Sequence, residues 1–458
     1  MTSLVGNEPT VAWIPESAMS VKEPAIRAKE GNIAETMDDH ALEPVPRSRR
    51  KPLLQLVMVQ VGWNISVSSF LVGGVVGAGT TFGEGMAAIA FGNLVLAVVA
   101  SLIGVIGFRT GMTSYLASRA VFGSSGSVLV SIVLGIVAMG FIGVLMDTWG
   151  GAVNHLIPAI PSSVFVVTFA LAILTTAIFG FKGLHRFSAV AVPIQVAIGL
   201  FALVRIGSLD GGFGEVFTVA PAAAIGFPAA MSSVVATWVT GAALVSDVQR
   251  YALRARDVVI SCLLSFVVGV GTFEVIATVS AMKVGQSNFV IVMQGLGLLA
   301  PAAVLLFLAL WNTADNNIYS ASLAFTSASN LMKLRLTKPV WTVVAVVIAV
   351  GIAFIGLADQ FGKFLGVIGV VVPPFAGMLI AHFWVVQRRV DAAQVLQDAP
   401  PVRWEAVGCW IAAALVAWFG EFLLVDAIEG LVSGFVLYTV VGLLLRRRRV
   451  RAVDTVEA

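Results

Sequence analysis

Long runs of apolar residues without a single charge constrain this chain more than any other feature. Residues 52–83, 120–146 and 339–358 contain no Asp, Glu, Lys or Arg. A helix of about 20 such residues is as long as the hydrocarbon layer of a bilayer is thick. Only 12% of the 458 residues are charged, which is about half the share found in soluble globular proteins. The chain is therefore predicted to be an all-α integral membrane protein.

Breaking these runs at charges, prolines and turn residues predicts about twelve transmembrane helices. The predicted spans lie near residues 53–79, 84–106, 126–150, 163–181, 188–206, 226–246, 258–280, 298–322, 338–357, 364–385, 405–424 and 428–445. Residues 1–50 have mixed charge and are expected to form a disordered cytoplasmic tail. Ten helices would then fall in residues 51–390, two more in residues 391–446, and a basic cytoplasmic tail in residues 447–458.

The distribution of Lys and Arg orients these helices, because such residues accumulate in cytoplasmic loops. With twelve spans and both termini in the cytoplasm, all but three of the 28 Lys and Arg residues fall on that side. The three exceptions are Arg205, Lys283 and Lys363. This asymmetry predicts a multi-pass protein of the plasma (inner) membrane. The C-terminal run Arg446–Arg449 is accordingly assigned to the lipid surface rather than to nucleic acid.

The first predicted span has an unusual composition for a membrane helix. Residues 62–69 read Gly-Trp-Asn-Ile-Ser-Val-Ser-Ser, and glycines follow at positions 73, 74, 77 and 79. Serine can bond to backbone carbonyls, and glycine adds backbone freedom. The helix is therefore expected to unwind and to free carbonyl oxygens for a small cation. Alternatively, the small residues only let neighbouring helices approach closely.

The sixth predicted span places an aromatic ring between hydroxyl groups at mid-membrane, in the sequence Thr-Trp-Val-Thr-Gly of residues 237–241. A planar ligand could stack on Trp238. The alternative is a Trp of the membrane interface, which fits poorly at this depth. Phe141 in the third span could face Trp238 across such a ring, or it could pack as an ordinary core residue.

The eighth predicted span is the most polar, with the sequence Trp-Asn-Thr-Ala-Asp-Asn-Asn in residues 311–317. Exposure of these groups to lipid would be prohibitive, so they are expected to face the interior of the protein. Asn312 and Thr313 offer oxygen ligands for Na⁺, and Asp315 could relay a proton or neutralise a cation. A purely structural hydrogen-bond network is the alternative. Glu274 in the seventh span is a further candidate proton site.

Motifs of soluble enzymes are missing from the sequence. It contains no hydrolase elbow, phosphate-binding loop or metal-spaced histidine pair in a soluble segment, and no soluble domain large enough for an ATPase. Transport would then be passive or driven by an ion gradient, with Na⁺ or H⁺ as coupling ion and no other cofactor. A channel would not explain a first span that is expected to unwind at mid-membrane. An integral-membrane enzyme would need a nucleophile, base or metal ligands near an interface, which the sequence lacks.

The motifs resemble those of the nucleobase:cation symporter family, which includes the cytosine and purine–cytosine permeases. The likeness covers nearly the whole membrane region and is densest between Gly92 and Gly123. Further matches are Val190–Pro193, Asp247 with the basic loop after it, Trp311–Asn316 and Val372–Pro374. Each motif alone is weak, but their order and spacing indicate membership of this family.

The resemblance implies a leucine-transporter-type fold with a ten-helix transport core. Spans one to five (about 53–206) and six to ten (about 226–385) would form an inverted repeat, with spans one and six broken at mid-membrane. The substrate ring would lie between the aromatic side chains of spans three and six. The substrate residues implied in this way, together with the buried carboxyl of span eight, are Phe141, Trp238, Thr240, Ser66, Val67, Ser68 and Asp315.

The resemblance also implies a cation site between spans one and eight. Its ligands would be the carbonyl groups of Gly62 and Ile65 together with Ala309, Asn312 and Thr313. Three positions depart from the family pattern: Phe141 replaces a Trp, Ala138 a Gln and Ala314 an Asn. The loss of two amides reduces the ability of the pocket to read the edge of a base.

The function implied by the resemblance is secondary active transport. The protein would import a nucleobase, cytosine or a related purine or pyrimidine, by cation symport with alternating access. The alternatives within transport are allantoin, a hydantoin, a thiamine-precursor pyrimidine or another small solute. The expected partners are therefore a small heterocycle and the lipid bilayer.

Overall fold

The computed structural model describes residues 39–221, 224–287, 289–334, 336–356, 361–388, 392–420 and 426–454, and their regular structure is helical. The helices are, in chain order, η2 (Arg47–Arg49), α2 (Leu53–Asn64), α3 (Val67–Gly79), α4 (Phe82–Thr110), α5 (Ser114–Phe122), α6 (Gly126–Leu156), α7 (Ser162–Ala177), α8 (Phe181–Ser208), α9 (Gly214–Thr218), α10 (Gly226–Leu244), α11 (Ser246–Gln249), α12 (Ala255–Leu263), η3 (Leu264–Val270), α13 (Gly271–Val284), α14 (Phe289–Gly295), α15 (Leu299–Leu331), α16 (Lys338–Phe354), α17 (Phe361–Ala381), η5 (His382–Val386), α18 (Ala392–Asp398), α19 (Trp404–Phe419) and α20 (Asp426–Asp454).

Each of the twelve predicted spans coincides with a helix or a group of consecutive helices in the described part of the chain. Seven helices there are long and apolar enough to cross a membrane, and the bent pair α2 and α3 raises this number to eight. The apolar helices α7, α16 and α19 are shorter, at 10–17 residues. Helix α15 has 33 residues with a polar middle. Length and composition thus support seven or eight spans, and the total of twelve stays a prediction.

The first predicted span is interrupted at its middle. Helix α2 ends at Asn64 and α3 begins at Val67, with a bend of 57° between them. Ser66 caps α3, because its hydroxyl oxygen accepts a hydrogen bond from the Ser68 amide (3.1 Å). The Ser69 hydroxyl donates to the Asn64 carbonyl (3.3 Å). Serine side chains therefore pair backbone groups that the break leaves without helical partners.

The glycines of α3 bring this helix against α13. A Cβ atom on Gly73 would lie 2.5 Å from the Glu274 carbonyl oxygen. A Cβ on Gly77 would clash with the Thr278 carbonyl oxygen, and the Thr278 hydroxyl donates to the Gly73 carbonyl (2.9 Å). The two explanations for the composition of this span therefore apply to different residues. The helix breaks at residues 65 and 66, and the glycines beyond the break allow close packing.

The sixth predicted span is not broken at mid-helix, so this prediction was wrong. Helix α10 is continuous through Trp238 to Leu244, and the chain leaves the helix only at Val245, before α11. A Cβ on Gly241 would come within 2.9 Å of the Trp238 indole. The Thr237 hydroxyl donates to a carbonyl of the preceding turn. The glycine thus makes room for the indole, and the threonine bonds within a regular helix.

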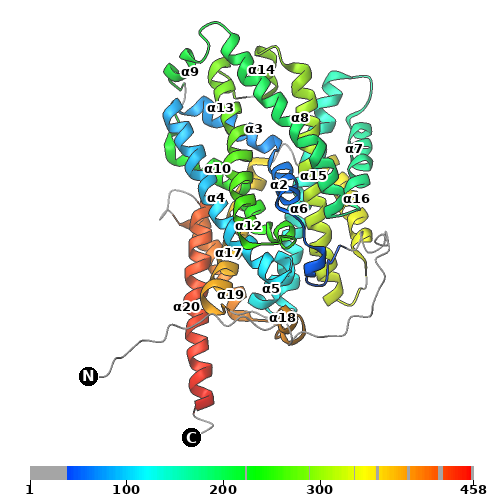
Figure 1. Cartoon of the computed structure of the whole chain (residues 1–458), viewed down its shortest axis with the longest axis vertical. Helices are drawn as coiled ribbons and strands as arrows, with labels where there is room; N and C mark the ends of the chain where they lie inside the picture. The colour runs from blue at the N-terminus through cyan, green and yellow to red at the C-terminus, as the bar shows by residue number, and fades with distance from the viewer. Residues whose placement is uncertain are drawn as a thin grey trace, which may run out of the picture.

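The N-terminal end of the chain is more ordered than predicted, and the last helix is longer than its predicted span. Residues 39–51, which we call the N-terminal segment, are packed: Ala41 and Val45 are buried, and the Val45 amide donates to the Gly111 carbonyl (2.9 Å). Residues 1–38 lie outside the described residues. Helix α20 continues beyond residue 446 to Asp454, because arginine is a good helix former, and it projects from the bundle (Figure 1).

Replacing Gly73 with Ala should destabilise the fold, although Gly→Ala inside a helix ordinarily stabilises by about 1 kcal/mol. The added methyl group would meet the α13 backbone, and overpacking of this kind costs about 1–3 kcal/mol. The matched control is Gly408→Ala in α19, where nothing lies within 4 Å of the new Cβ. Thermal unfolding in detergent should give a lower Tm for Gly73→Ala only. The reverse order would contradict the packing of α3 on α13.

Candidate functional site

A small cavity lies beside the break in the first span, between α2, α3, α6, α10 and α15. Two aromatic side chains, Phe141 and Trp238, contribute to its wall, and the Trp238 indole N–H donates to Ser69 Oγ (3.2 Å). The cavity measures about 20 Å³, which is room for one water molecule rather than a heterocycle. A ring could enter only if these side chains move. The lining residues are Trp63, Ser68, Phe141, Thr237, Trp238, Thr240, Gly241, Thr313 and Asn317.

The Thr240 hydroxyl is a buried polar group of this cavity that lacks a hydrogen-bond partner among the described residues. Its Oγ1 is buried and has no hydrogen bond within the described part of the chain. By contrast, the Thr237 hydroxyl donates to the Ser233 carbonyl and the Asn317 amide donates to the Thr313 carbonyl, both at 2.8 Å. Leaving a buried hydroxyl unpaired costs about 1–3 kcal/mol. Thr240 is therefore placed to bond a molecule that enters the cavity.

The structure brings four of the residues predicted to bind substrate together around the cavity: Ser68, Phe141, Trp238 and Thr240. Ser66 instead caps α3, and Val67 packs in an apolar cluster with residues of α6, α7 and α15. Asp315 is not part of the lining. Thr313 and Asn317 are four residues apart and share one face of α15, which turns Asp315 towards another face.

Four lining residues were not assigned to the site from the sequence: Trp63, Thr237, Gly241 and Asn317. The spacing of Asn317 from Thr313 is a signal that could have identified it, since residues four apart share a helix face. The position of Trp63 directly before the predicted break is a second such signal.

Residues predicted to bind the cation meet where α2, α8 and α15 cross. Asn312 Oδ1 accepts a hydrogen bond from Ser188 Oγ (2.9 Å), and Thr313 Oγ1 donates to the Trp63 carbonyl (3.3 Å). A Cβ on Gly62 would lie 2.5 Å from Ser188 Oγ and 3.2 Å from Asn312 Oδ1, so the α2 backbone contacts both side chains. Ser188 is a member of this cluster that the sequence did not indicate.

The end of α2 adds backbone oxygens to this cluster. Ile65 is the C-cap residue of α2, and both Ile65 and Ala309 are fully buried. The last carbonyl groups of a helix have no helical donors, so the carbonyl oxygens of Gly62 and Ile65 suit a hard cation such as Na⁺ together with Asn312 and Thr313. Within the described residues, no group of three or more His, Cys, Asp and Glu could hold a metal ion.

The two carboxyl groups that the sequence suggested as proton sites are buried and lie outside the cavity. Glu274 in α13 accepts a hydrogen bond from Asn93 Nδ2 in α4 (2.6 Å). The carboxyl oxygens of Asp315 have no well-aligned hydrogen bond in the part of the chain that the structure describes, and the polar group beside them is the Thr176 hydroxyl of α7. Burying a carboxylate without compensating donors is costly. A proton bound at either residue would neutralise that charge.

The end of the bundle formed by the N-terminal segment, the start of α8 and α11 is called the basic end. Asp247 in α11 closes the bundle between the cavity and this end. Its Oδ1 accepts from the Ser114 amide of α5 (3.1 Å), and its Oδ2 accepts from Ser320 Oγ of α15 (3.0 Å). The Ser114 hydroxyl in turn donates to the Ala243 carbonyl of α10 (3.2 Å). These hydrogen bonds connect α11 to α5 and α15, and α5 to α10.

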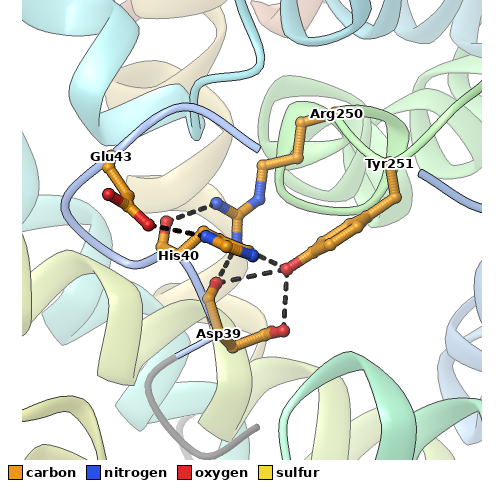
Figure 2. Close-up of polar contacts among 5 residues, drawn as sticks. All are labelled: Asp39, His40, Glu43, Arg250 and Tyr251. Atoms are coloured by element: carbon orange, nitrogen blue, oxygen red, sulfur yellow. Dashed lines mark hydrogen bonds and ion pairs between the residues drawn. The ribbon is translucent and has the colours of Figure 1, made fainter. Parts of the chain in front are cut away.

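Arg250 fastens the N-terminal segment across the basic end (Figure 2). Its Nη1 donates to the His40 carbonyl (2.7 Å) and its Nη2 to the Asp39 carbonyl (2.9 Å). Nη2 also lies 3.0 Å from Tyr319 Oη in α15. The Tyr251 hydroxyl donates to the Asp39 carboxylate (2.7 Å), and burial raises the pKa of Tyr251 well above its usual value. The Tyr251 phenol therefore remains a hydrogen-bond donor.

An apolar recess of about 310 Å³ adjoins the cavity on the side away from the basic end. It lies between α3 and α10 and shares Ser68 and Thr237 with the cavity. Leu71 and Val75 in its wall are 40% and 45% exposed. The cavity is thus separated from the basic end by hydrogen bonds, while Ser68 and Thr237 lie between it and a recess with a mostly apolar lining.

Comparisons with known proteins agree with this architecture. Residues 44–442 match a family described as permeases for cytosine/purines, uracil, thiamine and allantoin. The chain is 28% identical over 417 residues to the cytosine permease of Escherichia coli strain K12, covering 91% of this chain and 97% of that permease.

Two solved structures of Mhp1, described as a nucleobase-cation-symport-1 family transporter, share the fold. The closed conformation with bromovinylhydantoin bound gives a TM-score of 0.76 at 19% identity, covering 87% of this chain and 94% of that chain. The inward-facing conformation gives a TM-score of 0.74 at 19% identity, covering 89% and 94%. These matches confirm the predicted all-α fold of leucine-transporter type.

Replacing Arg250 with Met should open the basic end more often, because two charge-assisted bonds worth about 1.5–3 kcal/mol each are lost. A cysteine at Ala243, which is fully buried, would report this opening in a background with Cys262 and Cys409 replaced by Ala. Its reaction with a thiol reagent should become at least about tenfold faster. The control Arg254→Met removes an exposed arginine nearby and should leave the rate unchanged. Equal rates with and without Arg250 would contradict its role in closing this end.

Proposed function

Because this chain belongs to the family of permeases for cytosine/purines, uracil, thiamine and allantoin, we propose that it imports a nucleobase by cation symport. The similarity to a cytosine permease over nearly its whole length makes cytosine the first substrate to test. The observation that carries the proposal is the cavity at the break in the first span. It offers two aromatic rings for stacking and the unpaired hydroxyl of Thr240 for hydrogen bonding.

A planar base would stack on the Trp238 indole, with Phe141 on its other face. Stacking on an aromatic side chain contributes about 1–3 kcal/mol per base. The indole is oriented for this purpose by its hydrogen bond to Ser69. Thr240 Oγ1 would then bond to the edge of the ring, which removes the cost of an unpaired buried hydroxyl.

The choice among heterocycles depends on groups around the ring edge. Ala138 and Ala314 stand where the resemblance would place amides, and both pack in apolar clusters away from the cavity lining. Hydroxyl groups therefore dominate the polar part of the pocket. Allantoin, a hydantoin or a thiamine-precursor pyrimidine remain alternative substrates on this account, and competition with labelled cytosine would rank them.

For the coupling ion we favour Na⁺ bound between α2 and α15. Gly62 contacts Ser188 and Asn312 there, and Thr313 bonds the neighbouring Trp63 carbonyl. The carbonyl oxygens of Gly62 and Ile65 would complete the set of ligands. Trp63 links this site to the cavity, because its carbonyl accepts from Thr313 and its side chain lines the cavity. A proton carried by Asp315 or Glu274 is the alternative.

The transport cycle would follow alternating access in the plasma membrane, with both termini in the cytoplasm. The recess between α3 and α10 would admit the base from outside, while Asp247 and Arg250 keep the basic end closed. Release to the cytoplasm would require their hydrogen bonds to break. The ion and the base each stabilise the other, since coupling between binding sites is reciprocal.

Thr240→Val should raise the KM for the transported base by about 5- to 150-fold, because a hydrogen bond to a buried hydroxyl contributes about 1–3 kcal/mol. Valine keeps the shape of threonine and removes the hydroxyl. Thr237→Val is the matched control in the same helix and cavity, since the Thr237 hydroxyl is already bonded to Ser233, and its KM should change little. The measurement is uptake of labelled cytosine, uracil, adenine and hydantoin in a strain without its own permeases. A lack of saturable uptake for every heterocycle would overturn the proposal.

Replacing Na⁺ with choline at fixed pH should reduce uptake at least about tenfold, as expected for a coupled ion that contributes more than about 1.4 kcal/mol. Ser188→Ala should raise the Na⁺ concentration needed for half-maximal uptake, because Ser188 contacts Asn312 and Gly62. Two results together would assign the coupling to protons instead: uptake that does not depend on Na⁺, and an Asp315→Asn variant that fails to accumulate the base.

A further inference from the structure

A second pocket, of about 370 Å³, opens at the basic end, away from the substrate cavity. Its wall is formed by the N-terminal segment, the start of α2 and the first two turns of α8. Six of its lining residues carry basic side chains, and His40 among them is paired with Glu43. The other five are Arg49, Lys51, Lys182, His185 and Arg186.

The arrangement of these cations is unfavourable by itself. Lys182, His185 and Arg186 follow one face of α8, and like charges four residues apart on a helix repel each other. They also lie in the first turns of α8, where the helix dipole favours anions over cations. Lys51 faces the same helix from the N-terminal segment, and its charge acts on His185 together with that of Arg186.

The acidic lining residue of this pocket, Asp39, is already engaged. Its Oδ1 accepts from the Tyr251 hydroxyl (2.7 Å), and its Oδ2 accepts from the Phe181 amide at the start of α8 (3.1 Å). Lys338 Nζ also lies close by, since a Cβ on Gly180 would be 2.6 Å from Asp39 Oδ2 and 3.0 Å from Lys338 Nζ. Among the described lining residues, the positive charges of the pocket therefore exceed the negative ones.

We propose that this pocket binds a phosphate group, held by Lys51, Lys182 and Arg186. Arginine binds phosphate oxygens in bidentate fashion and lysine binds them as a point charge. Lipid headgroups of the cytoplasmic leaflet and free phosphate share this chemistry, and basic pockets between helices on that side suit anionic headgroups. The orientation of the basic end towards the cytoplasm rests on the proposed function.

A phosphate bound here would join the N-terminal segment to α8. The Lys51 amide donates to the Tyr251 carbonyl (2.6 Å), so Lys51 is fixed beside the residues that close the basic end. The bound anion would offset the repulsion between the cations and would stabilise the folded, closed arrangement. The expected result is a higher Tm in the presence of the anion, because any ligand that binds only the folded state stabilises it.

The test measures the Tm of the purified full chain in nanodiscs. One arm compares phosphatidylcholine alone with phosphatidylcholine plus phosphatidylglycerol, and a second arm adds inorganic phosphate to phosphatidylcholine discs at constant ionic strength. The wild-type Tm should rise by about 2 °C or more in at least one arm. A rise with phosphatidylglycerol alone identifies a lipid headgroup, and a rise with inorganic phosphate identifies a free phosphate.

The double variant Lys182→Gln/Arg186→Gln should lose at least half of this rise, and Lys51→Gln should lose part of it. The control Arg254→Gln/Arg256→Gln removes two exposed charges from the same end and should keep the full rise. Absence of a rise in both arms, or equal loss in the control, would overturn the proposal. The readout is thermal stability and requires no transport, so a failure of nucleobase uptake would leave this result unaffected.

Discussion

The break in the first span places unpaired backbone groups inside an apolar bundle, and much of the site depends on how they are paired. Asn64 is the last residue of α2, and its side-chain amide donates a hydrogen bond to the Ser265 hydroxyl. Ser66 caps α3, and the Ser69 hydroxyl donates to the Asn64 carbonyl. The same Ser69 hydroxyl accepts from the Trp238 indole. Ser69 thus bonds a backbone carbonyl at the break and also orients the Trp238 indole in the wall of the cavity.

Trp63 provides a short connection between the proposed cation site and the cavity, through which a bound cation and a bound base could influence each other. The Trp63 carbonyl accepts from Thr313, and the Trp63 side chain lines the cavity. Movement of the α2 end by a bound cation would therefore shift a wall of the substrate cavity. Coupling of this kind needs no long pathway, because both sites involve Trp63. The cation site would use its carbonyl group, and the cavity uses its side chain.

The sequence predicted the positions of the helices and the break in the first span, because charge-free runs and serine–glycine clusters are local signals. The break that the family resemblance implied for the sixth span is absent from α10, where Gly241 accommodates the Trp238 indole. That role depends on which way one side chain turns. The sequence also missed Ser188, whose contact with Asn312 joins residues 124 positions apart in the chain. No local pattern reports such a contact, and only the packing of α8 on α15 creates it.

The packing of the N-terminal segment was also not predicted from the sequence. Its composition suggested a tail, yet Arg250 is fully buried and needs acceptors, which residues 39 and 40 supply. Both residues have left-handed backbone angles, with φ of 54° and 50°, which are uncommon outside glycine. Aspartate and histidine adopt such angles more readily than most residues, so the sequence permits this geometry and the contact with Arg250 fixes it.

Arg250 bonds main-chain oxygens of this segment. The contact is therefore sensitive to mutation of Arg250 and less sensitive to mutation of the residues that supply the carbonyl groups. Most residues that accept the left-handed backbone at position 40 still have the main-chain carbonyl that Arg250 binds, so substitutions there leave this hydrogen bond in place. Few residues other than arginine offer several donors in a fixed plane. Homologues could therefore diverge in the segment while retaining the arginine, and a comparison of sequences alone would underestimate how firmly the segment is held.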